Sequence, residues 1–320
     1  DWSSRDLPAL LFLFSVNLEA FDGDQRRSLP VRALTRLQHL LRRNSRRGSR
    51  RNIAAHYDLG NDFYARWLDA SMTYSAAIYD RSLDLAEAQE RKYQLMLEQL
   101  DAAPGEHILE IGCGWGGFAE YAARRGMRVT AVTLSQAQYD FATQRIRAAG
   151  LQDRVGFRLA DYRTLQGQFD HIVSIEMFEA VGERYWATYH EVLQRCLRPG
   201  GRAALQAITI REDLFETYRH EAGGFIQRYI FPGGMLPTEN HLRTLARDAD
   251  LEPLSLARYG EHYADTLAEW AEAFNAQTTW LEEHGYDERF RRMWRYYLAF
   301  CEAGFRDGRI DLVHLCLHKA

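Results

Sequence analysis

Short apolar runs alternate with amphipathic segments through most of the chain after residue 84. An apolar run of about four to eight residues is typical of a buried strand, whereas apolar residues spaced three or four apart are typical of a helix. The apolar runs predict strands at 107–111, 127–133, 154–160, 169–175, 202–209, 251–259 and 309–318. The amphipathic segments predict helices at 84–100, 117–125, 135–149, 184–197, 238–249, 263–284 and 287–306. This alternation predicts an α/β fold with a parallel sheet and crossover helices.

One stretch, residues 210–237, fits no crossover helix. We interpret it as an insertion over the carboxyl ends of the strands, where open α/β sheets bind their ligands. Its part from Phe225 to Pro237 is apolar, aromatic and rich in glycine. Such a segment is either a packed loop or a slot for an acyl chain, in which aromatic faces could stabilise a positive charge.

The first 51 residues differ from the rest of the chain in charge. They carry 11 Arg against five Asp or Glu, although the whole chain has a formal charge of −4. Residues 7–14 are apolar enough for a short helix, and residues 29–47 place leucines on one helical face and arginines on the other. This pattern predicts either a solvated helix and linker or an interfacial helix that faces anionic lipid head groups. The segment has no interleaved aromatic residues, so we expect no nucleic-acid partner.

Length and composition set the outline of the molecule. A chain of 320 residues with 46% hydrophobic residues can bury a sizeable core. We divide it into a helical, Arg-rich segment at 1–51 and a main domain at 52–320. The four cysteines are far apart and lack the spacing of a zinc site or a disulfide framework, so we expect no metal and a cytoplasmic location. The longest apolar run, Ala9 to Phe14, is too short to span a bilayer.

A glycine-rich turn follows the strand predicted at 107–111. Gly112, Gly114 and Gly117 have the spacing G-x-G-x-x-G, which places a nucleotide-like ligand against a helix start. A dinucleotide site expects an acidic residue about 20 positions later, at the end of the next strand. That strand instead ends in Thr133-Leu134-Ser135, and the acidic residue comes early, at Glu110. The pattern E-x-G-x-G-x-G-G is more typical of S-adenosylmethionine-dependent methyltransferases than of NAD enzymes.

Two acidic residues, Glu176 and Glu179, come directly after the strand predicted at 169–175. Three positions apart, they would share one face of a helical turn. Acidic residues in a loop are usually solvated. Their apolar neighbours Met177 and Phe178, however, indicate that at least one carboxylate is partly buried, and a buried carboxylate needs a partner or a function.

Motifs spread from about residue 52 to the end of the chain carry a family resemblance. They are AHYDLGNDFY (55–64), MTYS (72–75), LEIGCGWGG (109–117), VTLSQAQ (132–138), MFEAVG (177–182), ALQAI (204–208), YIFPGGMLP (229–237) and HYADTLAEW (262–270). The set resembles the cyclopropane-fatty-acyl-phospholipid synthase family, which includes the mycolic acid cyclopropane synthases. The resemblance implies a Rossmann-like class I methyltransferase sheet over 52–320, a helical insertion over the active site and a small helical N-terminal extension.

The resemblance also implies a co-substrate and a reaction. S-adenosylmethionine would donate its methyl group to a cis double bond of an unsaturated phospholipid acyl chain at an anionic membrane surface. The resulting carbocation would lose a proton to bound bicarbonate, and a cyclopropane ring would close. The residues implied to contact the co-substrate are Tyr74, Ser75, Gly112, Gly114, Thr133, Gln138, Asp161 and Tyr162.

The resemblance implies that bicarbonate is held by Glu179, Tyr263, a histidine and two backbone groups, which we place at Ala76 and Ile208. Many members of the family read LHTI, YSC and GMFEH where this chain reads LQAI, YSA and EMFEA. The combination of LQ…I, EMxEAVG and YIFPGG resembles the plant-type synthases and a large bacterial subgroup of the family. The histidine is therefore replaced by Gln206, which can donate a hydrogen bond but cannot carry a proton. If Glu179 holds an anion, one of the two must keep a proton, so we expect a raised Glu179 pKa.

Two other functions remain open. A fatty-acyl C-methyltransferase would deliver the same methyl group but give a methylene or methyl-branched chain, or a furan precursor. A lipid-binding protein without catalysis would account for the changes at Gln206 and Ala76. For the catalytic protein we expect attachment to the inner face of the membrane. We also expect a homodimer, because one basic helix alone gives weak attachment.

Overall fold

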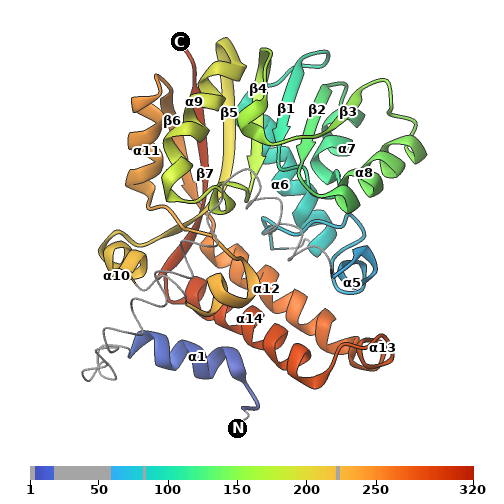
Figure 1. Ribbon diagram of the computed structural model, residues 1–320, viewed down its shortest axis with the longest axis vertical. Coiled ribbons are helices and arrows are strands. Elements are labelled where there is room, and N and C mark those ends of the chain that lie inside the picture. Colours follow the sequence, from blue (N-terminus) through green and yellow to red (C-terminus); the bar gives the residue numbers. More distant parts are fainter. Residues whose placement is uncertain (1–3, 18–58, 82–83, 221–223) are drawn as a thin grey trace.

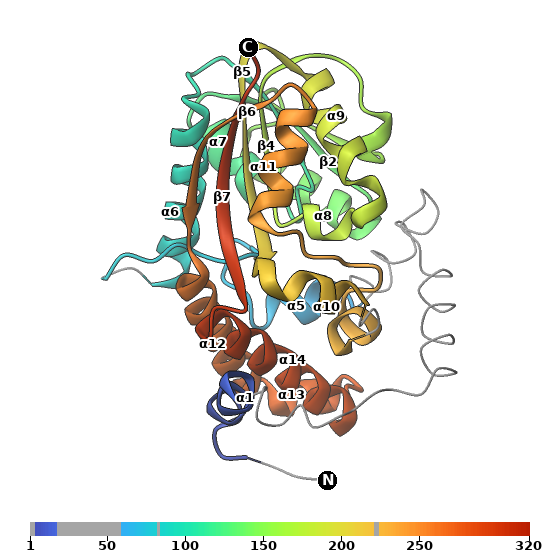
Figure 2. The same ribbon diagram turned by 90° about the vertical axis from the view of Figure 1, so that its left-hand side faces the viewer.

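The computed structural model describes residues 4–17, 59–81, 84–220 and 224–320. Its strands form one seven-stranded sheet in the order β3-β2-β1-β4-β5-β7-β6, with helices on both faces (Figure 1). The strands are β1 (His107–Ile111), β2 (Arg128–Thr133), β3 (Val155–Leu159), β4 (Phe169–Ile175), β5 (Leu197–Ile210), β6 (Glu252–Arg258) and β7 (Ile310–His318). Helices α6 (Leu85–Leu100) and α7 (Gly117–Arg124) cover one face, and α9 (Trp186–Cys196) and α11 (Glu239–Asp248) cover the other (Figure 2). The predicted α/β fold is confirmed.

The direction of the last strand differs from the parallel sheet predicted. Strands β1 to β5 pair in parallel, but β7 pairs antiparallel with both β5 and β6. After β6 the chain forms α12 (Gly260–Ala276) and α14 (Glu288–Arg306) beyond the carboxyl ends of the parallel strands. Because α14 returns the chain at that same edge, β7 has to run in the opposite direction. The sheet is therefore mixed.

Two predicted boundaries also change. The helix predicted at 263–284 is split into α12 and α13 (Thr278–Glu283), because a tight turn at Gln277, whose N–H donates to Phe274 O, closes α12. The strand predicted at 202–209 begins earlier, at Leu197, since backbone hydrogen bonds to Lys319 extend the ladder. The apolar helix predicted at 7–14 is present as α1 (Leu7–Val16). The Arg-rich helix predicted at 29–47 lies outside the described residues.

The insertion at 210–237 contains α10 (Phe215–His220) and the π-helix η5 (Ile226–Ile230). It lies with α12 and α14 at the carboxyl edge of the sheet, as predicted (Figure 1). Buried aromatic rings connect this lobe to α5 (Asn61–Ala65) and to Trp67, two residues beyond its end. Phe63 meets Trp294 edge to face with centroids 5.1 Å apart, and Trp67 meets Trp270 at 5.7 Å. Such pairs add about 0.5–1.5 kcal/mol beyond simple burial. They hold the lobe, which consists of the insertion, α12 and α14, in place over the strand ends.

Helix α6 begins at a reciprocal cap. The Asp84 carboxylate accepts a hydrogen bond from Glu87 N at 2.9 Å, and the Glu87 carboxylate accepts one from Asp84 N at 3.2 Å. Two backbone N–H groups that would otherwise lack partners are thereby satisfied. The cap is relevant to function because α6 carries Gln89 and Lys92, which are fully buried and point toward the strand ends.

Replacing Asp84 with Ala should lower the free energy of unfolding by about 1 kcal/mol, because the helix start loses its acceptor. Urea denaturation at pH 7 measures this change. Glu90→Ala, at an exposed position on the same helix, is the matched control and should change the free energy by less than about 0.5 kcal/mol. Equal effects of the two substitutions would show that the cap does not hold α6.

Candidate active site

The glycine-rich turn joins β1 to α7 with three residues in the left-handed region. Gly112, Gly114 and Gly116 have φ values of 88°, 50° and 83°, which other residues adopt only at a cost. A Cβ on Gly112 would also lie 2.8 Å from Met177 Cγ. The turn is held from below because Gly112 N and Cys113 N both donate to Val132 O. The side of the turn that faces the cavity therefore consists of backbone atoms, which a ligand can approach closely.

This turn forms one end of a cavity of about 1090 Å³. The co-substrate residues inferred from the sequence all line this cavity except Asp161. The Asp161 carboxylate instead pairs with the Arg163 guanidinium at 2.6 Å and accepts a hydrogen bond from Arg163 N. Its neighbours Ala160 and Tyr162 line the cavity. A local ion pair occupies the Asp161 carboxylate in this structure, and its contact with the co-substrate stays a prediction.

Glu110 supplies a second test of the co-substrate. Its carboxylate lines the cavity and is 3% exposed, and burial raises its pKa. Among the described residues, Oε2 has no hydrogen-bond partner. A cationic ligand beside the glycine turn would supply one. The bare turn and the unpartnered acid therefore fit S-adenosylmethionine, which carries an ammonium and a sulfonium group.

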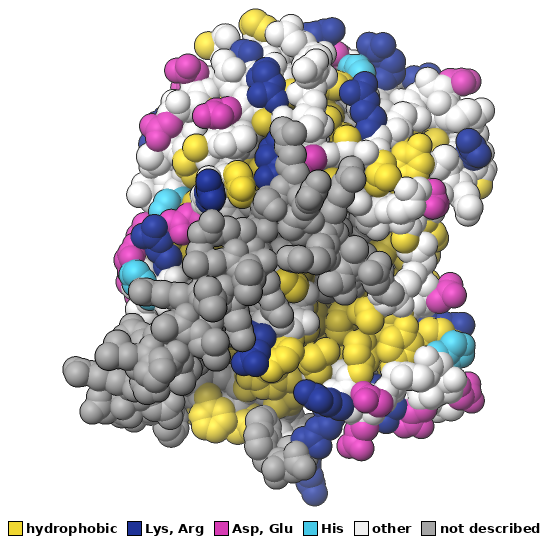
Figure 3. Space-filling view, in the orientation of Figure 1, with side chains coloured by type: hydrophobic (Ala, Val, Ile, Leu, Met, Phe, Trp, Pro, Cys, Tyr) yellow, Lys and Arg dark blue, Asp and Glu magenta, His cyan; other side chains and the backbone are white. Residues whose placement is uncertain are grey.

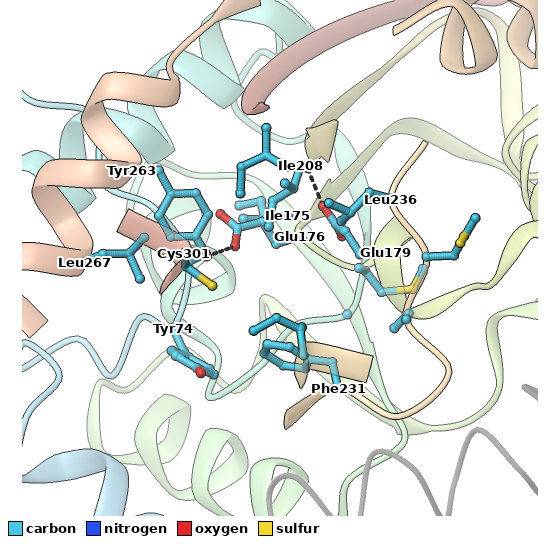
Figure 4. A pocket seen from close by; sticks show the side chains of 18 of the residues that line it. Tyr74, Ile175, Glu176, Glu179, Ile208, Phe231, Leu236, Tyr263, Leu267 and Cys301 are labelled. Carbon is cyan, nitrogen blue, oxygen red and sulfur yellow. Dashed lines mark hydrogen bonds between the residues drawn. The ribbon is translucent and has the colours of Figure 1, made fainter. Parts of the chain in front are cut away.

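Glu176 lies at the centre of the site, directly after β4. Its Oε1 accepts hydrogen bonds from Ala76 N at 2.8 Å and from Gln206 Nε2 at 2.7 Å, and its Oε2 accepts one from Tyr263 OH at 2.6 Å. Figure 4 shows the carboxylate beside the Tyr263 hydroxyl, with the hydrogen bond between them as a dashed line. The structure thus brings together Ala76, Gln206 and Tyr263, as predicted, but around a carboxylate of the chain itself.

His314, on β7, fixes the orientation of Gln206. Its ring Nε2 lies 2.7 Å from Gln206 Oε1. Burial lowers the His314 pKa to about 3, so the ring is neutral and donates from Nε2. The amide oxygen of Gln206 is then occupied, and its NH₂ group faces Glu176. No sequence pattern indicated a role for His314, because β7 is far from Gln206 in the chain.

A buried lysine lies behind the same site. Lys92 Nζ donates to Ser75 Oγ and to Gln89 Oε1, each at 2.6 Å. Burial lowers the Lys92 pKa to about 7, while the charge of Glu176 opposes that shift. The sequence interpretation missed this residue. Its signal was that Lys92 is one of only two lysines in a chain whose other basic residues are all arginine.

Glu179 is the second buried acid. Its Oε1 accepts a hydrogen bond from Ile208 N, and its Oε2 has no partner among the described residues. Burial and the neighbouring Glu176 raise the Glu179 pKa to about 8. The raised pKa predicted from the sequence is confirmed, but its cause is different. The sequence argument needed a bound anion, whereas burial and a second carboxylate are sufficient.

These contacts test the predicted bicarbonate. The Ala76 N–H, the Gln206 amide and the Tyr263 hydroxyl all donate to Glu176, and the Ile208 N–H donates to Glu179. The donors assigned to the anion are therefore already matched with carboxylates of this chain. The same four donors cannot bind bicarbonate while they hold these carboxylates. The physical reason is that a glutamate, rather than the glycine of the GMFEH motif, reaches into that space.

The other end of the cavity is apolar. Its walls come from the insertion, from α14 and from α1, and they include Leu214, Phe225, Phe231, Leu236, Tyr296 and Phe300. Tyr296, Tyr297 and Phe300 of α14 all line the cavity, whereas Trp294 of the same helix is buried in the packing of the lobe. The cavity thus connects a polar end at the glycine turn, two buried acids and an apolar arm.

Comparison with known proteins gives a consistent family. A family model described as mycolic acid cyclopropane synthetase matches residues 44–315. Tuberculostearic acid methyltransferase UfaA1 of Mycobacterium tuberculosis is 45% identical over 278 residues, which cover 84% of this chain and 65% of that protein. Cyclopropane-fatty-acyl-phospholipid synthase of Escherichia coli K12 is 40% identical over 264 residues, covering 80% and 65%. The chain thus spans slightly less than two thirds of the length of these two relatives.

Solved structures show the same fold. Mycolic acid cyclopropane synthase CmaA1, complexed with SAH and CTAB, superposes with a TM-score of 0.80 at 30% identity and covers 84% of this chain and 98% of that one. The cyclopropane synthase MmaA2 from Mycobacterium tuberculosis gives 0.79 at 30% identity, with the same coverage. The family match over 44–315 and the 45% identity to a curated relative show that this chain belongs to the mycolic acid cyclopropane synthetase family and has its class I methyltransferase fold.

Proposed function

We propose that this protein transfers the methyl group of S-adenosylmethionine to a cis double bond in the acyl chain of an unsaturated phospholipid. The observation that carries the proposal is the single cavity that connects the glycine turn, the two buried acids and the apolar arm. Support also comes from relatives named as a cyclopropane-fatty-acyl-phospholipid synthase and as fatty acid methyltransferases.

The chain's own side chains suit a reaction at an alkene. S-adenosylmethionine supplies an electrophilic methyl group, and an alkene is a weak nucleophile, so the protein has to position the two and exclude water. Tyr74, Phe231 and Tyr263 surround the space beside Glu176 (Figure 4). Their aromatic faces would stabilise the positive charge that develops on the acyl chain.

Two products can follow from the carbocation. If the transferred methyl group loses a proton while its carbon bonds to the cationic carbon, a cyclopropane ring forms. If a hydride first migrates to the cationic carbon, the same proton loss gives a methylene branch. Cyclopropane formation is the first proposal. The branched product is the second candidate, favoured by the 45% identity to a relative named tuberculostearic acid methyltransferase.

Expression in a host without cyclopropane lipids, fed methionine with a fully deuterated methyl group, should give new fatty acids that are heavier by one labelled CH₂ unit. Loss of one deuterium would place the lost proton on the transferred methyl group. Gas chromatography–mass spectrometry detects the mass, and proton NMR separates a ring from a methylene branch. If neither product appears although the protein is folded and binds S-adenosylmethionine, the proposed reaction is wrong.

An apolar surface beside the cavity supports a membrane as the source of the substrate. Helix α1 packs on α14, and its Leu11 and Phe14 line the cavity. Its Leu13 and Val16 are 56% and 53% exposed. Figure 3 shows hydrophobic side chains gathered over the lower lobe, which contains α1, α13 and α14. No helix among the described residues is both long and apolar enough to span a bilayer, so the proposal is contact with the membrane surface.

Replacing both Leu13 and Val16 with Asn should weaken binding to phosphatidylglycerol vesicles by about tenfold, since roughly 1.4 kcal/mol of apolar transfer is lost. Vesicle co-sedimentation measures the binding. Leu254→Asn is the matched control, because Leu254 is 48% exposed on β6, an edge strand of the sheet. Equal vesicle binding by the two variants would show that α1 does not contact the membrane.

The buried acid Glu179 should make stability depend on pH. The unfolded chain releases the Glu179 proton at a pKa of 4.5, whereas the folded chain keeps it up to about 8. Between these values the folded state binds more protons, so the free energy of unfolding falls as pH rises, by about 1.4 kcal/mol per pH unit from this group. Urea denaturation from pH 5 to 8 should show that Glu179→Gln loses this component. Parallel profiles for wild type and variant would show that Glu179 ionises normally.

A further inference from the structure

The partners of Glu176 show which form of the carboxyl group the site holds. Ala76 N–H and the Gln206 amide, the latter fixed by His314, can only donate to it. The Tyr263 hydroxyl donates as the third partner. A protonated carboxyl would place a hydrogen against this set of donors. The arrangement therefore matches a carboxylate. Burial raises the Glu176 pKa, but the three hydrogen bonds and the positive charge of the buried Lys92 oppose that rise.

The backbone of Glu176 is held in an unfavourable conformation. Its φ of 49° lies in the left-handed region, which non-glycine residues adopt at a cost of about 1–2 kcal/mol. The many members of the family that read GMFEH have glycine at this position. A residue that keeps backbone strain where glycine would relieve it points to a function for its side chain. That side chain lines the cavity beside Tyr263 and Ile208.

We propose that Glu176 replaces bicarbonate as the group that removes the proton from the carbocation. The inference rests on the proposed methyl transfer to an acyl-chain double bond. In that step the sulfonium carbon–sulfur bond breaks and the alkene electrons form the new carbon–carbon bond. A C–H bond of the transferred methyl group then breaks. Its proton goes to a Glu176 carboxylate oxygen, and its electron pair closes the ring or forms the methylene double bond. No oxidant or reductant is needed.

The pair of acids explains why a fixed base can work next to a carbocation. Glu179 keeps its proton because burial and Glu176 disfavour a second negative charge, so one carboxylate faces the cation. Three hydrogen bonds hold that carboxylate in place. They restrict it to proton removal, because covalent capture of the cation would require the carboxylate to leave its donors.

The test uses the wild-type protein and the variants Glu176→Gln and Glu176→Gly, with labelled S-adenosylmethionine and unsaturated phospholipid vesicles. In buffer depleted of carbon dioxide, the wild type should keep its rate when bicarbonate is added. Glu176→Gln should lose activity by about a hundredfold or more, as expected for the loss of a general base. Glu176→Gly, which relieves the backbone strain and recreates the family motif, should be equally slow and should recover at least tenfold with bicarbonate or formate.

Glu212→Gln is the matched control, because Glu212 is exposed and lies two residues after β5. This variant should keep wild-type activity and should not respond to either anion. Calorimetric binding of S-adenosylmethionine shows whether each variant is folded. A wild-type rate that depends on bicarbonate would overturn the inference, as would a Glu176→Gly variant that is active without an added anion or is not rescued by one. Neither outcome contradicts the proposed function. The proposed function fails only if the wild-type protein methylates no acyl chain.

Discussion

Burying the Glu176 carboxylate is the constraint on which the rest of the site depends. A charge taken out of water is tolerated only when hydrogen-bond donors replace the water. Those donors come from three distant parts of the chain: Ala76 before α6, Gln206 on β5 and Tyr263 on α12. The site is therefore complete only when the sheet, the segment before α6 and the α12–α14 lobe are all assembled.

The same burial gives neighbouring groups different charge states. Glu176 faces donors and the buried Lys92, whereas Glu179 has one backbone donor and a carboxylate neighbour. The second acid consequently keeps its proton at neutral pH, although both have the same side chain. Environments that separate the pKa values of two like groups are a common way to assign different roles to them. In the proposed reaction, this difference leaves one base beside the space in which the carbocation would form.

Much of the architecture could be predicted from local pattern. The strands from β1 to β4, the glycine turn and the cap region of α6 follow from apolar runs, glycine spacing and helical period, which are properties of neighbouring residues. The direction of β7 could not be predicted in this way, because it depends on where α14 returns the chain. The ion pair between Asp161 and Arg163 was also not predicted, because it depends on the local side-chain geometry and not on the hydrophobic pattern.

The sequence by itself determined the family, the place of the glycine turn and the identity of two acids after β4. It also determined that glutamate stands where related motifs have glycine. Only the tertiary structure decided which groups that glutamate contacts, because its donors lie 100 residues before it, 30 after it and 87 after it. Hydrogen bonding between such distant groups depends on the folded geometry. The donors that the family motif assigned to bicarbonate thus proved to hold a carboxylate of the chain itself.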